Sequence, residues 1–234
     1  MKKKKTTIFL AGDSTVATYQ KNQFPMSGWG QMLKPYFLDK VEIQNEALCG
    51  RSSKSFIEEG VLDKIEANLD KGDYLFIQFG HNDEKTDDRG TDPYTSYQSS
   101  LSQYILKALD KGANPILFTP VERRHFSEEN KLADTHGEYP KAMEQLAVLL
   151  EIPIIDLREK TKKLFESLGK DKSKDLFVWL KPNESENYPD GISDDTHFND
   201  NGAKQVASLV VEGLKELQLP LTEYLKDFNE NNKA

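Results

Sequence analysis

Five short apolar runs along the chain constrain its fold more than any other feature. They occupy residues 7–10, 41–44, 74–79, 115–119 and 153–157 and are rich in Ile, Val and Phe. Strands that are hydrophobic almost throughout are typical of parallel sheets covered on both faces. Patterns typical of helices lie between and after the runs, at residues 29–38, 55–69, 93–109, 138–150 and 201–217. We therefore predict an α/β fold, a three-layer α/β/α sandwich around a five-stranded parallel sheet.

The length and charge of the chain limit its organisation and its partners. A chain of 234 residues fits one domain. We expect that domain to span residues 1–219, and we expect residues 220–234 to form a C-terminal tail at the surface or frayed. The formal net charge of -8 argues against a nucleic-acid partner. A lone cysteine, Cys49, excludes an internal disulfide and a cysteine-rich zinc site.

The N-terminus resembles a signal peptide only in its lysines. The apolar stretch at residues 8–11 is much shorter than the roughly 7–15 residues of a signal-peptide core. Cleavage there would also remove the serine motif described below. No window approaches the ~20 apolar residues of a membrane span. We expect a cytoplasmic protein without a membrane partner, or a secreted one if a signal has been removed.

Three polar motifs lie near the ends of predicted strands or just before the last helix. They are GDST at residues 12–15, GHND at residues 80–83 and DDTH at residues 194–197. In parallel sheets of this class, ligands bind at the carboxyl ends of the strands. We therefore expect the three motifs to meet at one site.

Together the motifs supply the parts of a serine hydrolase. Ser14 is the candidate nucleophile, but a serine hydroxyl needs a base to remove its proton. His197 suits that role, and Asp194, three positions earlier, can orient the imidazole and stabilise its cation. Asp195 is the alternative orienting carboxylate.

A tetrahedral intermediate also needs hydrogen-bond donors for its oxyanion. The candidates are the backbone N–H groups of Ser14 and Gly50 and the side-chain amide of Asn82. Glycine at position 50 would allow a close approach of the substrate.

These residues resemble the SGNH or GDSL-type hydrolases. The four marker residues of that family match Ser14, Gly50, Asn82 and His197, and Asp194 matches its acid. The likeness runs from about residue 7 to residue 217 and is greatest to a subgroup similar to rhamnogalacturonan acetylesterases. The stretches that carry it are GDSTVA at 12–17, GWGQ at 28–31, GRS at 50–52, GHND at 80–83 and THGEYP at 135–140.

The resemblance implies a flavodoxin-like sheet, the SGNH hydrolase fold, and catalysis without metal or cofactor. It also implies removal of O-acetyl groups from pectic sugars through an acyl-enzyme. Secreted members carry a signal peptide, which this sequence does not show. We therefore expect imported acetylated rhamnogalacturonan oligosaccharides as the substrate rather than the polymer.

Two long polar segments, residues 121–137 and 169–197, are candidates for substrate contacts, because long ordered loops are often functional. The planar guanidinium group of arginine can bind the carboxylate of a galacturonate through two hydrogen bonds. Three arginines are therefore candidate substrate contacts; the alternative is that each is a solvated surface charge. Two histidines and one tryptophan are further candidates, against structural roles. The six residues are Arg51, His81, Arg123, Arg124, His136 and Trp179.

Other functions stay open to different degrees. Another short-chain esterase of the same family is one alternative, such as an acetylxylan esterase, a lysophospholipase or a thioesterase. A non-catalytic carbohydrate-binding protein is another, although it would have no use for the three triad residues. The Asp-x-His pairs come too late in the chain for a metallophosphoesterase. A classical α/β-hydrolase is disfavoured because the chain has no Gly-x-Ser-x-Gly motif.

Overall fold

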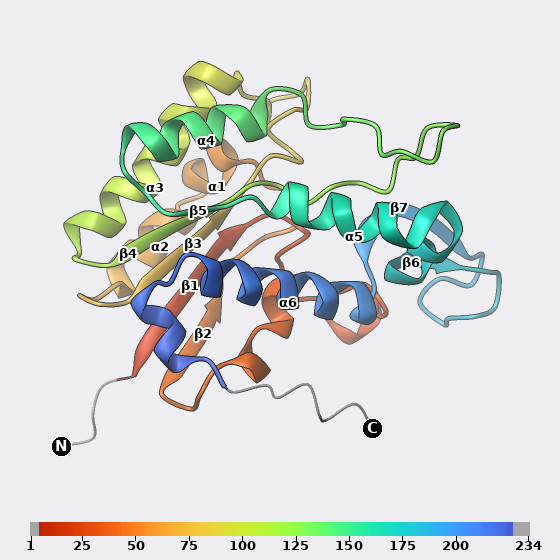
Figure 1. Ribbon diagram of the computed structural model, residues 1–234, viewed down its shortest axis with the longest axis horizontal. Helices are drawn as coiled ribbons and strands as arrows, with labels where there is room; N and C mark the ends of the chain where they lie inside the picture. The colour runs from red at the N-terminus through yellow and green to blue at the C-terminus, as the bar shows by residue number, and fades with distance from the viewer. Residues whose placement is uncertain (1–4, 227–234) are drawn as a thin grey trace.

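A computed structural model describes residues 5–226. Its centre is a five-stranded parallel sheet in the order β2-β1-β3-β4-β5, as Figure 1 shows. The strands are β1 (Thr6–Gly12), β2 (Val41–Asn45), β3 (Tyr74–Gln78), β4 (Asn114–Phe118) and β5 (Ile154–Ile155). All five lie within or close to the predicted runs. The predicted fold class, with five parallel strands between helices, is therefore confirmed.

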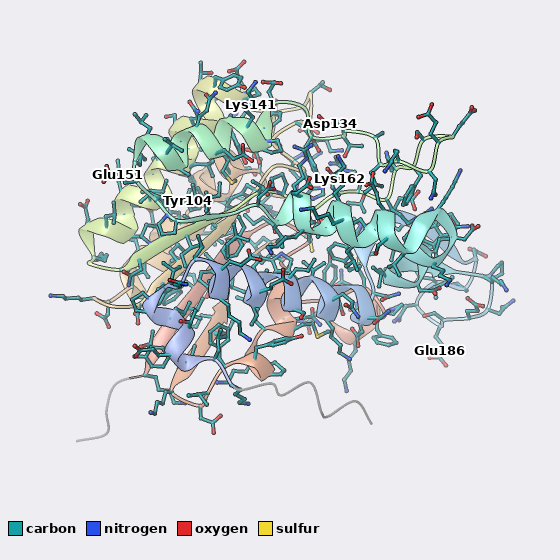
Figure 2. The ribbon with its side chains drawn as sticks, viewed as in Figure 1. Tyr104, Asp134, Lys141, Glu151, Lys162 and Glu186 are labelled. Atoms are coloured by element: carbon teal, nitrogen blue, oxygen red, sulfur yellow. The ribbon has the colours of Figure 1, made fainter. Side chains whose placement is uncertain are left out.

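Helices cover both faces of the sheet, as expected from strands that are apolar on both faces. Alternate residues of β1 show this, because Phe9 joins one hydrophobic cluster and Leu10 joins the other. The Phe9 side is covered by α1 (Ser53–Glu58), α2 (Val61–Asn68), α3 (Gln98–Asp110) and α4 (Tyr139–Leu149). The Leu10 side is covered by α5 (Leu157–Lys172) and α6 (Asp200–Glu216). Figure 2 shows Tyr104 inside the helical layer and Lys141 and Glu186 at the periphery.

Three predicted helices differ from the observed ones. The run at 29–38 forms two 3-10 helices, η2 (Trp29–Met32) and η3 (Lys34–Tyr36), since Pro35 has no N–H to continue a helix. Residues 55–69 divide into α1 and α2 at Gly60, whose φ of 75° is left-handed. Residues 93–109 begin with a π-helical turn, η4 (Pro93–Tyr97), before α3.

The segment at 169–197, predicted to be a loop, is mostly regular structure. It holds the end of α5, the 3-10 helix η5 (Ser173–Leu176) and an antiparallel hairpin of β6 (Phe177–Leu180) and β7 (Ile192–Phe198). Apolar periodicity did not predict α5, because only Leu157, Thr161 and Phe165 are buried among its many charged residues. Residues 121–137 are irregular, apart from a bridge between Phe126 and Leu132.

The C-terminal segment is less peripheral than expected as far as residue 226. A 3-10 helix, η6 (Pro220–Tyr224), buries Leu221 completely against the Leu10 side of the sheet. The Tyr224 carbonyl also accepts a hydrogen bond from Leu38 N–H at 2.8 Å. The buried Leu221 side chain and this backbone hydrogen bond explain why residues 220–226 pack against the rest of the protein. The rest of the predicted tail, 227–234, lies outside the described residues.

The N-terminal segment that follows the first motif adds one further short helix, η1 (Lys21–Gln23). Within residues 5–226, no helix combines the length and the apolar character needed to cross a membrane.

Close packing of α6 against η5 gives a testable prediction. A methyl group on Gly202 would lie 1.9 Å from the Leu176 carbonyl oxygen, a backbone atom that no rotamer change can move. Gly202→Ala should therefore lower the free energy of unfolding by about 1–3 kcal/mol. It should do so although alanine is the better helix former by about 1 kcal/mol. Denaturant unfolding measures this.

Ser208→Ala is the matched control, because Ser208 is exposed on the same helix. It should leave the free energy of unfolding unchanged or slightly higher. Equal stability of the Gly202→Ala and Ser208→Ala proteins would contradict the packing argument.

Candidate active site

The three residues predicted as a triad lie in one hydrogen-bonded chain. Ser14 Oγ lies 3.0 Å from His197 Nε2, and His197 Nδ1 lies 2.7 Å from Asp194 Oδ2. Ser14 follows directly after β1, at the carboxyl end of the sheet. Asp194 and His197 lie on β7, and not in a loop before the last helix as the sequence suggested. Figure 1 shows this hairpin beyond the end of the sheet toward which β1 points.

Asp194 is held in place by the backbone around it. Its Oδ1 accepts hydrogen bonds from Thr196 N–H at 2.7 Å and His197 N–H at 2.8 Å, while Oδ2 faces the imidazole. Burial alone would raise the pKa of Asp194, but the bonds from His197 and Thr196 and the charge of His197 hold that pKa below its ordinary value. Asp194 is therefore an ionised acceptor that fixes the tautomer of His197.

Asp195, the alternative orienting carboxylate, faces another group. Its Oδ1 accepts from Arg124 Nε at 2.6 Å and from Trp179 Nε1 at 2.9 Å. The Arg124 N–H also donates to the Asp195 carbonyl at 2.8 Å, and the guanidinium lies 4.8 Å from the centre of the Trp179 ring. Asp195 thus connects the hairpin to the segment after β4, and Asp194 is the carboxylate that faces His197.

The turn that carries Ser14 rests on a buried polar network. Asp13 Oδ1 accepts from Thr15 N–H at 2.9 Å and from Thr15 Oγ1 at 2.8 Å. Gln78 at the end of β3 donates to Thr15 Oγ1 at 2.7 Å, and Trp29 Nε1 donates to Gln78 at 2.9 Å. Burial raises the pKa of Asp13, and the bonds from Thr15 act against this rise. Asp13 therefore organises the turn and makes no contact with the Ser14 hydroxyl.

Glycines let a second segment lie directly against this turn. A Cβ on Gly28 would meet the Ala17 carbonyl oxygen at 2.2 Å, and one on Gly30 would meet the Val16 carbonyl oxygen at 2.5 Å. Between them, Trp29 N–H donates to the Thr15 carbonyl at 2.9 Å. The Gly-Trp-Gly stretch is thus explained by close backbone packing behind the nucleophile.

The expected oxyanion donors lie on the turns that follow β1, β2 and β3. Within the part of the chain that the structure describes, the N–H groups of Ser14 and Gly50 have no acceptor. Gly50 has a φ of 78°, which favours glycine. Asn82 Nδ2 donates to the Arg51 carbonyl at 3.0 Å, and its Oδ1 accepts from Arg89 Nη1 at 3.2 Å. These contacts fix the amide, and its second N–H remains for an oxyanion.

Two residues beside the site had no signal in the sequence. Arg89 comes from a charged surface loop and reaches both Asn82 and the Gly50 carbonyl, the latter at 3.4 Å. Tyr19 donates from its hydroxyl to the Ser14 carbonyl at 2.9 Å, and burial raises its pKa. Side-chain contacts of this kind depend on loop paths, which periodicity does not specify.

Four of the six candidate substrate residues lie inside the protein. His81 and His136 are 3% and 1% exposed, and Arg124 is 5% exposed and paired with Asp195. The Arg123 side chain is 11% exposed and pairs with Glu84. This burial argues against direct contact with a substrate. Three of the four come from the segment 121–137, and their partners are Glu84 for Arg123, Asp195 for Arg124 and the Val121 carbonyl for His136.

Arg51 and Trp179 keep exposed surface. Arg51 pairs with Glu59 at 3.0 Å, and its side chain is 40% exposed. Trp179 is half-buried, with Arg124 and Lys174 against its ring. Either can still meet a ligand from solvent.

One group of side chains has the composition of a metal site. The ligand atoms of His81, Glu84 and His136 lie within 4.8 Å of one another. Burial, with the charges of His136 and Arg123, holds the pKa of His81 well below its ordinary value. The Val121 carbonyl acts against this lowering, but neither His81 nitrogen makes a hydrogen bond of acceptable geometry with it.

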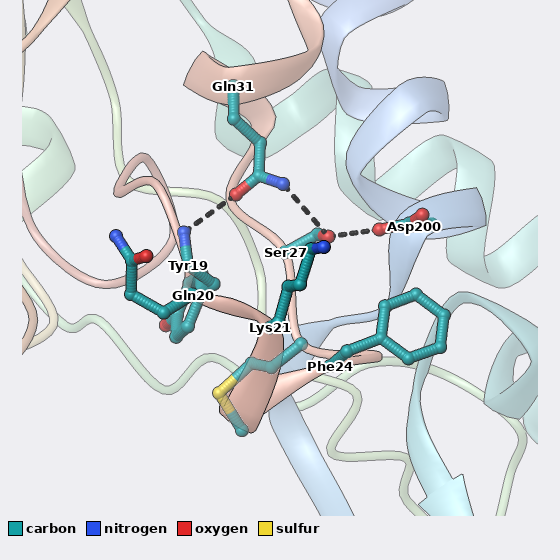
Figure 3. A pocket seen from close by; sticks show the side chains of 8 residues that line it. Tyr19, Gln20, Lys21, Phe24, Ser27, Gln31 and Asp200 are labelled. Atoms are coloured by element: carbon teal, nitrogen blue, oxygen red, sulfur yellow. Dashed lines mark hydrogen bonds between the residues drawn. The ribbon is translucent and has the colours of Figure 1, made fainter.

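A surface hollow of about 380 Å³ lies beside the nucleophile turn (Figure 3). Gln31 accepts from Tyr19 N–H at 2.9 Å and donates to Ser27 Oγ at 3.3 Å, and Ser27 donates to Asp200. Polar and aromatic side chains line it together: Tyr19, Gln20, Lys21, Phe24, Met26, Ser27, Gln31 and Asp200. The hollow is connected to the site through Tyr19, which contacts Ser14.

Comparison with known proteins agrees with this geometry. The family described as GDSL-like Lipase/Acylhydrolase matches residues 8–210. Rhamnogalacturonan acetylesterase RhgT of Bacillus subtilis is 50% identical over 225 residues, which cover 96% of each chain. The probable rhamnogalacturonan acetylesterase YesY of the same organism is 43% identical and covers 92% of this chain and 95% of its own.

Solved structures show the same arrangement. The Bacillus subtilis protein YxiM superposes with a TM-score of 0.78 at 28% identity, covering 92% of this chain and 58% of its own. A lipase/acylhydrolase from Enterococcus faecalis shares the fold, with a TM-score of 0.60 at 18% identity over 96% and 99% of the two chains. The match over most of the chain and the identity to its relatives place this protein in the family of GDSL-like lipases and acylhydrolases.

Proposed function

We propose that this protein is a serine esterase that removes O-acetyl groups from carbohydrate, with acetylated rhamnogalacturonan oligosaccharides as its substrate. The observation that carries the proposal is the hydrogen-bonded chain from Ser14 through His197 to Asp194. Two relatives support the substrate class. The one at 50% identity is named a rhamnogalacturonan acetylesterase, and the one at 43% identity is named a probable rhamnogalacturonan acetylesterase.

The geometry supports a two-step reaction. Ser14 Oγ attacks the acetyl carbonyl while His197 Nε2 takes the hydroxyl proton and Asp194 stabilises the imidazolium. The oxyanion accepts hydrogen bonds from the N–H groups of Ser14 and Gly50 and from the Asn82 amide. When the intermediate collapses, His197 gives its proton to the departing sugar oxygen. Water, deprotonated by His197, then attacks the acyl-enzyme and releases acetate.

The hollow beside Tyr19 supports a sugar rather than a long acyl chain. Its polar groups are Gln20, Lys21 and Asp200, and the exposed ring of Phe24 offers an apolar face. Hydroxyl-rich rings need both kinds of contact, whereas a fatty acyl chain needs a continuous apolar groove. Lys21 and the partly exposed Arg51 are two candidate cations for a galacturonate carboxylate.

Loss of the nucleophile tests the reaction class. Ser14→Ala should reduce kcat for 4-nitrophenyl acetate by several orders of magnitude, about 10⁶ as for loss of a triad serine elsewhere. The fold should survive, because the Ser14 side chain takes no part in the network of Asp13. The assay compares 4-nitrophenyl acetate with the octanoate ester and then uses acetylated rhamnogalacturonan fragments.

If Ser14→Ala retained a tenth of the wild-type activity, Ser14 would not be the nucleophile and the proposed mechanism would be wrong. Preference of the wild type for octanoate would favour a lipase or thioesterase instead. Absence of turnover in the wild type would favour a carbohydrate-binding protein.

The two neighbouring aspartates should separate catalysis from stability. Asp194→Asn keeps an oxygen for Thr196 and His197 N–H but permits the wrong imidazole tautomer, so kcat should fall by about 10⁴ with little change in Tm. Asp195→Asn removes the charge that faces the buried Arg124, so it should lower the free energy of unfolding by about 3 kcal/mol or more.

At a temperature where both variants are folded, Asp195→Asn should keep far more activity than Asp194→Asn. Paired kcat measurements and thermal unfolding of the two proteins test this. The reverse order of activities would make Asp195 the orienting residue.

A further inference from the structure

His81, Glu84 and His136 converge beside the active site, although the esterase reaction uses none of them. His81 and Glu84 lie on the turn after β3, and His136 lies just before α4. Their ligand atoms lie within 4.8 Å of one another, and the two imidazole rings meet edge to face with centroids 4.7 Å apart. Three potential ligands from two segments therefore surround one buried point.

His136 is oriented as a metal ligand would be. Its Nε2 lies 2.8 Å from the Val121 carbonyl, which can only accept, so Nε2 carries the proton. In a neutral ring, Nδ1 then carries a lone pair, and Glu84 Oε2 lies 3.3 Å from it. Two facing acceptors in a buried place need a cation or a proton between them. A ring N–H donated to a backbone carbonyl is the usual support of a metal-bound histidine.

His81 supplies the second, independent observation. The residue is 3% exposed, and neither of its ring nitrogens has a hydrogen-bond partner within the described residues. A buried imidazole with both nitrogens unpaired loses its hydrogen bonds to water and gains none from the protein. Such groups call for a bound ion or water that the protein atoms do not supply.

Carboxylate oxygens without a donor also lie at and near the cluster. Arg123 neutralises Glu84 from its other oxygen, which leaves Oε2 free to face the histidines. Near the cluster, Asp13 Oδ2 and Glu122 Oε2 are buried without a hydrogen-bond partner. Each of these carboxyl groups keeps one buried oxygen without a donor, while Thr15 and Arg158 bind the other oxygen.

From these contacts we propose that His81, Glu84 and His136 form a structural binding site for a divalent first-row transition metal, with zinc as its ordinary occupant. Two imidazoles and one carboxylate suit zinc and its neighbours, whereas magnesium and calcium prefer oxygen ligands throughout. Metal–ligand bonds of about 2.0–2.2 Å require the three atoms to close by roughly 1 Å or more from their present separation. Small side-chain rotations of His81 and Glu84 supply this, and water completes a tetrahedral shell.

The bound metal would join the turn that carries Asn82 to the segment before α4. It would act as a staple behind the oxyanion donor and would take no part in acetyl transfer, which the triad performs.

Zinc binding to the full-length protein tests the site. After treatment with chelator and dialysis, isothermal titration with Zn²⁺ should show one equivalent bound per chain, and Zn²⁺ should raise the Tm. Mg²⁺ at the same concentration should do neither. Co²⁺ in place of Zn²⁺ should give the visible absorption of a tetrahedral site.

His136→Gln and Glu84→Gln should each weaken zinc binding by more than the roughly 10–100-fold that loss of an outer-shell partner costs. His125→Gln is the matched control, because His125 is an exposed histidine in the same loop. Near-UV circular dichroism of the metal-free variants shows whether each is folded. If one of the two ligand variants does not fold, the zinc affinity of the other one provides the test.

Several results would overturn the proposal. One is absence of stoichiometric zinc binding by the wild type, which would leave His136 as a protonated partner of Glu84. Another is equal zinc affinity in the His136→Gln, Glu84→Gln and His125→Gln proteins. Since binding and Tm are measured without substrate, either failure leaves the esterase proposal untouched.

Discussion

The hydrogen bond between Ser14 Oγ and His197 Nε2 joins residues 183 positions apart, and the proposed active site depends on it. A bond of this kind forms only if both ends are held to within a fraction of an ångström. On one side, the chain from Trp29 through Gln78 to Thr15 fixes the turn after β1. Because Gln78 ends the neighbouring strand β3, the nucleophile is positioned by the sheet itself.

The other end of that bond is held by different interactions. The hairpin of β6 and β7 does not pair with the main sheet, so it needs separate attachment. Arg124 supplies it by binding Asp195 through both side chain and backbone. Ser27 N–H donates to the Phe198 carbonyl at 2.8 Å, which adds a contact from the segment behind the nucleophile. The two halves of the triad are thus connected through the molecule as well as through the reacting atoms.

The sequence predicted the parts of this protein that follow from local pattern. The five strands are continuous apolar runs, and their ends place Ser14 and Asn82 at one edge of the sheet. The helix α5 was missed because charged residues dominate it and few of its side chains are buried. The hairpin was missed because Asp194, Asp195 and Thr196 alternate with no apolar residue. Strand pairing there is imposed by long-range contacts, which periodicity does not report.

Most of the candidate substrate residues face inward because they pair with other groups of the protein. Arg123, Arg124 and His136 come from a polar loop, and polar loops are ordinarily solvated. Here the arginines of the loop pair with Glu84, on the turn after β3, and with Asp195 on β7. Composition cannot distinguish a charge that meets solvent from one that meets a buried partner, because the difference lies in the path of the chain.

Among the described residues, the buried side chains with an unpaired polar atom follow the carboxyl ends of the strands, whereas the two hydrophobic clusters lie on the two faces of the sheet. Asp13, His81 and Glu122 each keep at least one polar atom without a partner in the described residues. Such groups oppose folding, so the apolar packing must offset their cost. They persist where a fixed electrostatic environment has a use. Here the unpaired groups lie near three functional elements that we propose: the turn that carries Ser14, the turn that carries Asn82 and the cluster of two histidines. Each of these elements needs a fixed electrostatic environment.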